Sequence, residues 1–399
     1  MKKNAGRYLT VLCCLIMGMA LGTVMTYTAM TGNGGGPEST AGTAKYEEIM
    51  GLVDQFFIGE DVDPEQVNDA MASGIIAGLG DRWSYYVSAK DYQAYMENIN
   101  NAYVGVGITI SAKTDENETL LGYEVSEVTA GGPAEEAGVE PGDVLIRAAG
   151  EDVTQISLEE TKNLVKGEEG TSVELTFLRD GAEVAFTVER RAMTVIPAEG
   201  RMLAGQVGYI KIDNFDSGCA ETVKALAEML RDQGASSLLF DVRNNPGGLK
   251  TELTDLLDYL LPEGTIFHTV NYAGEEEIIT SDASCVDMPM AVLVNGNSYS
   301  AAEYFACALQ EYGVGVVIGE QTFGKGYYQV GLQLSDGSCV NLSIGKYFTP
   351  NGESLIDVGV TPDVPLELSE EETLELARNR LAPEDDPQIQ AAIGCLKPE

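Results

Sequence analysis

A serine and a lysine, each beside a predicted strand, are the residues of this sequence best suited to catalysis. Ser300 follows the apolar strand MAVLVNG and begins the helix SAAEYFACALQEY. Its hydroxyl would lie at a helix N-terminus, where amide groups favour developing negative charge. A serine nucleophile needs a base, and a lysine can serve if burial lowers its pKa from about 10.4 to roughly 7–8. Lys325, flanked by glycines in GEQTFGKGYYQ, is the candidate base, and Gln329 could hold its amine.

Both residues also have a purely structural explanation. Ser300 and Glu303 form the Ser-x-x-Glu pattern of a capping box, which begins many helices without any catalytic role. Lys325 taken alone is equally well explained as a surface lysine. The local pattern therefore leaves catalysis and helix capping both open.

The segment DVRNNPGGL is the candidate oxyanion hole, because it also lies where a strand leads into a helix. Gly247 and Gly248 expose backbone N–H groups there, and the amide of Ala301 next to the candidate nucleophile would be a second donor. The alternative is that the two glycines only form a tight strand-to-helix turn.

Other catalytic chemistries fit the sequence poorly. His268 is the single histidine, and it lies in the strand-like segment TIFHTV, so a Ser-His-Asp triad or a typical zinc site is not expected. GEQTFGK matches the start of a phosphate-binding loop, but Gly326 stands where Ser or Thr is needed and a strand follows. No C-x-x-C pair is present. We therefore expect neither a metal nor an organic cofactor.

Composition and the N-terminus limit the partners and the location. The chain has 399 residues and a formal net charge of −39, which argues against a nucleic-acid partner. Basic residues precede an uncharged run over residues 8–30 that is long enough to span a bilayer. We interpret residues 1–30 as a cytoplasmic tip and an uncleaved single-pass anchor in the cell membrane, with the catalytic part extracytoplasmic. Residues 31–44 are expected to form a flexible stalk.

The remaining chain divides into segments that differ in their pattern of apolar and polar residues. We expect an α/β fold, because buried strands alternate with helices over residues 192–368 and need crossover connections. The other segments are a helical N-terminal segment over 45–101, a compact module of strands and small helices over 102–191, and an acidic, partly helical and loosely packed tail over 369–399.

Several of these segments, in this order, resemble the carboxyl-terminal processing peptidase family, also called tail-specific proteases. The resemblance covers about Tyr46 to Glu367 and rests on these segments: GLGDRWSYYVSAKDYQAY, YVGVGI, VTAGGPAEEAGVEPGDVLIRAAGEDV, DVRNNPGG, NGNSYSAAEYFACAL and GEQTFGKGYYQ. It implies a ClpP/crotonase-like peptidase core with an inserted PDZ domain. It also implies that Ser300 is the nucleophile, Lys325 the base and Gln329 its support.

The resemblance also implies how substrates are bound. An extended peptide would add as a strand beside VGVGITI, its carboxylate held by amides around five residues: Val104, Gly105, Val106, Gly107 and Ile108. The implied function is an endopeptidase that cuts unfolded or C-terminally exposed proteins near their C-termini, with the PDZ domain recruiting tails and gating the site. The alternative is a non-catalytic membrane scaffold that binds peptide C-termini. One departure is Tyr299, which is bulky beside the nucleophile. Whether the chain forms a homo-oligomer stays open.

Overall fold

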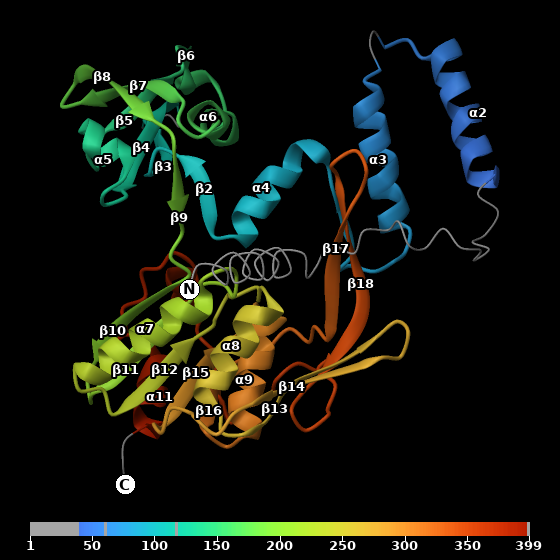
Figure 1. Ribbon diagram of the computed structural model, residues 1–399. Helices are drawn as coiled ribbons and strands as arrows, with labels where there is room; N and C mark the ends of the chain where they lie inside the picture. Colours follow the sequence, from blue (N-terminus) through green and yellow to red (C-terminus); the bar gives the residue numbers. More distant parts are fainter. Residues whose placement is uncertain (1–39, 60–61, 116–118, 397–399) are drawn as a thin grey trace, which may run out of the picture. The chain divides into compact units, whose positions relative to one another are not determined.

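The computed structural model describes residues 40–59, 62–115 and 119–396 (Figure 1). The predicted anchor over residues 1–30 lies outside these ranges. No helix within them is long and apolar enough to cross a membrane. Residues 40–44 of the predicted flexible stalk belong to helix α2 (Thr40–Phe56), and residues 31–39 lie outside the described ranges. The chain divides into two compact units, and each is described by itself.

The first unit holds α2, α3 and a β-hairpin. Helix α3 (Pro64–Ala77) begins with Pro64, a residue that favours the first helical position, and Asp63 accepts a hydrogen bond from the Glu65 amide. Strand β1 (Tyr85–Val87) pairs antiparallel with β18 (Cys339–Phe348), which pairs antiparallel with β17 (Tyr327–Gln333). The sequence Asp336-Gly337 predicts a hairpin turn, and it joins β17 to β18 as expected. Helix α4 (Ala89–Ile99) then leads out of this unit.

The second unit contains the compact module expected over residues 102–191. Its sheet has the strand order β3-β4-β5-β7-β8, with β6 pairing β5, and β2 pairs separately with β9. The bounds are β2 (Ala102–Gly105), β3 (Ile108–Thr114), β4 (Leu120–Val128), β5 (Val144–Ala148), β6 (Glu151–Asp152), β7 (Ser172–Arg179), β8 (Ala182–Glu189) and β9 (Arg191–Thr194).

Two local sequence patterns in this module form the structures that they predict: Asp180-Gly181 predicts a hairpin turn, and Ser157 with Glu160 three residues later predicts a capping box. The β7–β8 turn has positive φ at both Asp180 and Gly181, as a two-residue hairpin requires. Helix α6 (Leu158–Val165) begins with the predicted capping box of Ser157 and Glu160. Together with α5 (Pro133–Ala137), α6 covers an apolar core that includes Leu145, Leu175 and Phe177, which are fully buried.

A second sheet of six strands forms the rest of this unit. Its order is β10-β11-β12-β15-β16-β19, and every pairing after the antiparallel β10–β11 pair is parallel. The bounds are β10 (Ala198–Leu203), β11 (Val207–Ile212), β12 (Ser237–Asp241), β15 (Met290–Val294), β16 (Gly315–Gly319) and β19 (Val364–Pro365). All residues of β12 and β15 are buried, which explains their continuous apolar sequence. The α/β prediction is therefore confirmed for this region.

Helices cover both faces of this sheet. On one face lie α7 (Cys219–Asp232), α8 (Lys250–Leu260) and α9 (Ala301–Glu311), and Phe305 of α9 packs edge-on against Phe240 of β12. On the other face lies α11 (Pro387–Cys395), whose Ile389 and Ala392 pack with Leu239 and Leu293. Strands β13 (Gly264–Asn271) and β14 (Glu276–Ser281) follow α8 in the chain.

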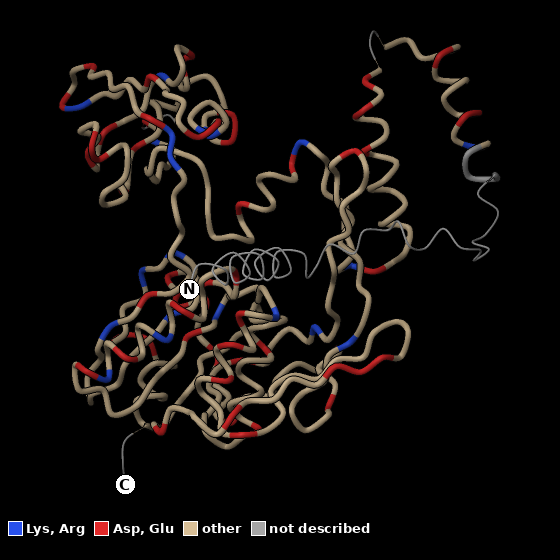
Figure 2. The backbone as a smooth tube through the Cα atoms, in the orientation of Figure 1, with Lys and Arg blue, Asp and Glu red and all other residues tan. Residues whose placement is uncertain are grey.

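The packing of α11 corrects one prediction. The acidic tail was expected to be loosely packed, and that holds only for α10 (Glu370–Ala377), which buries no side chain. Apolar residues at helical spacing from Ile389 to Leu396 instead complete the core. Figure 2 shows that Asp and Glu are spread over both units rather than gathered in one patch.

Candidate active site

Ser300 occupies a strained turn between β15 and α9. Its φ is 60° and its ψ is −123°, although the residue that caps a helix N-terminus normally has extended backbone. A positive φ is uncommon for a residue other than glycine, and such strain is typically retained at functional sites. A sharp strand-to-helix turn of this kind projects the nucleophile of many serine hydrolases. The capping-box geometry with Glu303 is present too, but a cap alone does not need this conformation.

Glu303 connects the Ser300 turn to the Lys325 loop. Its carboxylate is fully buried, and one oxygen, Oε2, accepts hydrogen bonds from the amides of both Ser300, at 3.1 Å, and Lys325, at 2.9 Å. Because both donate to the same oxygen, the backbone nitrogens of Ser300 and Lys325 lie close to each other. The structure thus brings the backbones of the two predicted catalytic residues together, and the half-buried Lys325 lies in a loop that is held at its own amide.

The other carboxylate oxygen of Glu303 fixes the rest of the loop. Oε1 accepts from the Thr322 hydroxyl and from the Gly324 amide, both at 2.6 Å. Burial raises the pKa of Glu303, while these four hydrogen bonds favour its ionised form and oppose the rise. The sequence had indicated Glu303 only as half of a capping box. Its position three residues after Ser300 was the signal, but its partners after residue 320 could not be read from that spacing.

The Gly247–Gly248 turn packs directly against the nucleophile. A Cβ atom placed on Gly247 would lie 2.7 Å from the Cβ of Ser300 and 2.8 Å from the Ala301 nitrogen. One on Gly248, whose φ is 153°, would lie 2.3 Å from the carbonyl carbon of Phe215. Both distances are shorter than any real contact, so only glycine fits at either position. The predicted oxyanion segment and the predicted nucleophile are therefore neighbours.

The three backbone amides predicted to form an oxyanion hole differ in whether they already have a hydrogen-bond acceptor. The Gly247 amide donates to Oδ1 of Asn245 at 2.8 Å, so it is already engaged. The amides of Gly248 and Ala301, by contrast, donate to no other residue in the part of the chain that the structure describes. Of the three amides predicted to form an oxyanion hole, those of Gly248 and Ala301 are thus the two without a partner among the described residues.

Gln329 lies on β17, in the first unit. Its side-chain nitrogen donates to the Ser343 hydroxyl at 2.9 Å and to the Tyr327 carbonyl at 3.3 Å, both within the β17–β18 hairpin. The predicted support of the Lys325 amine by Gln329 stays a prediction.

The predicted peptide-binding residues lie around the junction of β2 and β3. Val104 and Gly105 end β2, Ile108 begins β3, and the carbonyls of Val106 and Gly107 accept hydrogen bonds from Ala134 and Thr129, each at 2.9 Å. Among the described residues, the amides of Val106 and Gly107 donate to no other group. In the part of the chain that the structure describes, strand β3 is also an edge strand, since β4 is its single partner. An edge strand beside unengaged amides can accept an extended peptide and its carboxylate.

A buried ion-pair network links the start of the oxyanion segment to the C-terminal helix. Arg243 is bidentate to Asp241, at 2.9 and 2.6 Å, and its remaining nitrogen reaches Asp386 at 2.8 Å and Gln388 at 2.9 Å. Although burial alone raises it, the pKa of Asp241 is lowered, because the Arg243 guanidinium lies beside that carboxylate. Residues of α11 thus help to hold the segment that leads to Gly247.

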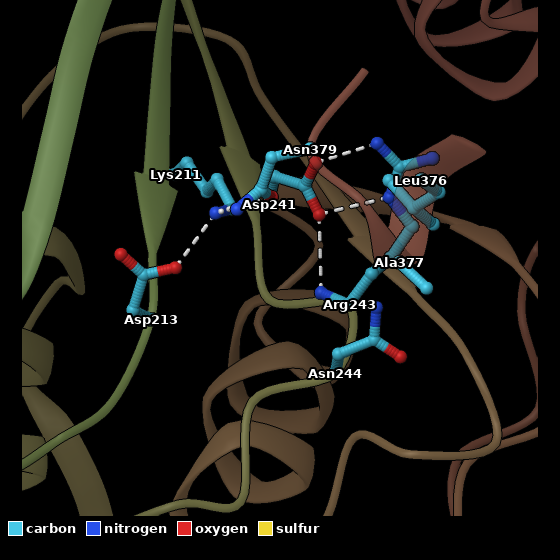
Figure 3. A pocket seen from close by; sticks show the side chains of 8 residues that line it. All are labelled: Lys211, Asp213, Asp241, Arg243, Asn244, Leu376, Ala377 and Asn379. Atoms are coloured by element: carbon cyan, nitrogen blue, oxygen red, sulfur yellow. Dashed lines mark hydrogen bonds and ion pairs between the residues drawn. The ribbon is translucent and has the colours of Figure 1, made fainter. Parts of the chain in front are cut away.

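Beside this network lies a cavity of about 210 Å³ (Figure 3). Its charged side chains are paired with each other: Lys211 contacts Asp213 at 2.8 Å, and Arg243 contacts Asp241. We therefore interpret it as a packing feature at the junction with α10. In the described ranges, no group of three or more His, Cys, Asp or Glu side chains is arranged to hold a metal ion. His268 packs against the ring of Phe348.

Comparisons with known proteins identify the family of this chain. Peptidase family S41 matches residues 206–366, and the PDZ domain matches residues 124–179. The carboxyl-terminal-processing protease of Synechocystis is 33% identical over 329 residues, which cover 81% of this chain and 75% of that protein. The carboxy-terminal processing protease CtpA of Bacillus subtilis is 29% identical over 376 residues, covering 92% and 78% respectively.

The solved structure of a putative S41 protease from Bacteroides fragilis has the same fold. It is 18% identical, covers 85% of this chain and 92% of its own, and has a TM-score of 0.54. The chain therefore belongs to the carboxyl-terminal-processing protease family and is a serine peptidase with a PDZ domain. Family membership favours the predicted peptidase over the non-catalytic scaffold.

Proposed function

We propose that Ser300 and Lys325 are the catalytic dyad of this peptidase, which cleaves proteins near their C-termini. The single observation that supports the dyad best is the Glu303 oxygen shared by the amides of both residues. Neutral Lys325 takes the hydroxyl proton as the Ser300 oxygen attacks the substrate carbonyl, and the amides of Gly248 and Ala301 stabilise the oxyanion. The leaving amine takes that proton, and water then hydrolyses the acyl-enzyme.

The pH dependence tests the lysine base. We expect kcat/KM to rise by about tenfold per pH unit until Lys325 is deprotonated, because only the neutral amine accepts a proton. A profile that stays flat between about pH 6 and 9 would exclude a lysine base. Lys325→Met should remove both the activity and the rise.

The effect of Lys325 on the pH profile must be separated from that of a second titrating group, Asp216. It adjoins the oxyanion turn, since a Cβ on Gly248 would lie 2.7 Å from its nitrogen. Burial, together with the charge of Glu252, raises the pKa of Asp216 to about 6. Ionisation of Asp216 above that pH places negative charge near the oxyanion and lowers activity as pH rises, opposite to the effect of Lys325. Asp216→Asn should therefore remove any fall near pH 6 and leave the rise at higher pH intact.

The PDZ domain is proposed to recruit substrate tails and to gate the active site. The unengaged amides of Val106 and Gly107 next to the edge strand β3 support this role. A peptide with a free C-terminal carboxylate should bind about tenfold more tightly than the same peptide with an amidated end, since the amide lacks the charge that those N–H groups favour. Fluorescence anisotropy measures both affinities, and equal affinities would contradict carboxylate recognition. Gating requires, in addition, that an uncleavable tail peptide accelerates cleavage of an unrelated short substrate.

Membrane anchoring remains a proposal that rests on the sequence of residues 1–30. The uncharged run after Lys2, Lys3 and Arg7 supports an N-terminus inside and a peptidase outside the cell membrane. The full chain should sediment with membranes and be digested by protease added to intact cells, whereas a chain beginning at residue 40 should not sediment. Recovery of the full chain in the supernatant after lysis would argue against the anchor.

A further inference from the structure

Two aromatic side chains lie beside the proposed dyad, one next to each member. Tyr299 immediately precedes Ser300, and Phe323 stands two residues before Lys325. Their ring centroids are 5.6 Å apart, with the ring planes inclined at 54°. The Phe323 amide also donates to the Ser298 carbonyl at 3.2 Å, so backbone as well as side chains join the two segments.

The backbone of Tyr299 is held between the nucleophile and the oxyanion turn. Its amide donates to the Asn245 carbonyl at 3.2 Å, and its own carbonyl accepts from Ala302 at 3.3 Å. That carbonyl oxygen would lie 2.9 Å from a Cβ atom on Gly247. The backbone of Tyr299 is therefore held between Ser300 and the Gly247–Gly248 turn, the two elements that would contact a scissile peptide bond.

These aromatic side chains remain accessible. Phe323 is 40% exposed and Tyr299 is half-buried. Val358, which is 62% exposed, belongs to the segment packed against the lysine loop, since its nitrogen would lie 3.0 Å from a Cβ atom on Gly324. Exposed apolar groups gathered beside a reactive centre are typical of a surface that contacts substrate.

We propose that Tyr299 and Phe323 form the subsite for the substrate residue whose carbonyl Ser300 attacks, and that this residue is apolar and of the size of leucine. The proposal rests on the proposed dyad. The attacked carbonyl carbon of the substrate bonds to the Ser300 oxygen. Consecutive Cα atoms are about 3.8 Å apart, so Tyr299 lies one residue from that bond. The substrate side chain next to the attacked carbonyl is therefore within reach of the Tyr299 ring. Neither aromatic side chain carries a charge, so a charged substrate side chain would lose hydration there without gaining a counter-ion.

Two series of measurements test this subsite. The first uses peptides that differ only at the residue before the scissile bond, with leucine, alanine or aspartate there, and compares kcat/KM. The wild type should prefer leucine to alanine by at least about tenfold, as apolar pockets discriminate by missing methylene groups. Tyr299→Ala and Phe323→Ala should each bring this ratio toward one. Tyr272→Ala removes a tyrosine that is 76% exposed and has no proposed role, so it is the matched control and should leave the ratio unchanged.

The second series separates failure of the subsite from failure of the dyad. A small acylating probe without a side chain at this position should label the wild type, Tyr299→Ala and Phe323→Ala, but not Ser300→Ala. If the probe labels both aromatic variants and their leucine-to-alanine ratio of kcat/KM is unchanged, the subsite proposal is overturned and the dyad is not. Absence of Ser300-dependent labelling in the wild type would overturn the dyad and the subsite with it. If Phe323→Ala does not fold, Phe323→Leu keeps an apolar side chain at this exposed position and should lower the ratio in the same direction.

Discussion

Replacing Ser300 with alanine should reduce cleavage of an unfolded test protein by at least about 10³-fold, because no other group would attack the carbonyl. The fold should persist, since alanine at this position keeps the backbone strain of φ 60° without adding to it. Cleavage is measured by mass spectrometry of the products, and folding by urea unfolding.

The matched control is Ser284→Ala, which removes a hydroxyl from an exposed serine outside the site. It should cleave at the wild-type rate. If Ser300→Ala retained more than a few per cent of the wild-type rate, Ser300 would not be the nucleophile. The strained turn would then require another explanation.

The second large effect is expected for Glu303→Gln. Each carboxylate oxygen of Glu303 accepts two hydrogen bonds, and the amide of glutamine replaces one of those oxygens with a donor. Either the Thr322 and Gly324 pair or the Ser300 and Lys325 pair would then face an N–H group. Since these are buried bonds to a charged acceptor, we expect a loss of about 2–4 kcal/mol in the free energy of unfolding.

A positioning role predicts more than lost stability. At a temperature where Glu303→Gln is fully folded, kcat should still fall at least about tenfold, because displacing a catalytic group by a fraction of an ångström removes much of the benefit of orientation. Glu221→Gln, on the exposed side of α7, is the control and should change neither quantity. A destabilised variant with wild-type kcat when folded would mean that Glu303 is only structural.

The local features of this chain could be predicted from the sequence. The Asp180-Gly181 turn depends on two adjacent residues that tolerate positive φ, and the Ser157-Glu160 capping box depends on a spacing of three. The buried strand before Ser300 and the helix after it were likewise predicted by continuous apolar sequence and periodicity. Ser300 and Lys325 could be singled out because each stands at such a predictable boundary.

Contacts between distant segments could not be predicted in this way. The sequence gives no reason for the Gly247 amide to be engaged by Asn245 while the Gly248 amide is not, because this depends on how the turn meets Phe215 and α9. The tail was misjudged for a related reason. Its high acidic content suggested solvation, whereas the apolar positions of α11 cover a face of the sheet that formed from residues far earlier in the chain.

The sequence by itself determined which elements form and which two residues stand at their ends, since turn chemistry and apolar periodicity act over a few residues. Only the tertiary structure decided that one buried carboxylate oxygen is shared by amides 25 residues apart, those of Ser300 and Lys325. That arrangement requires the loop after β16 to meet the turn after β15, and a buried carboxylate is stable there only when its hydrogen-bond donors are all in place.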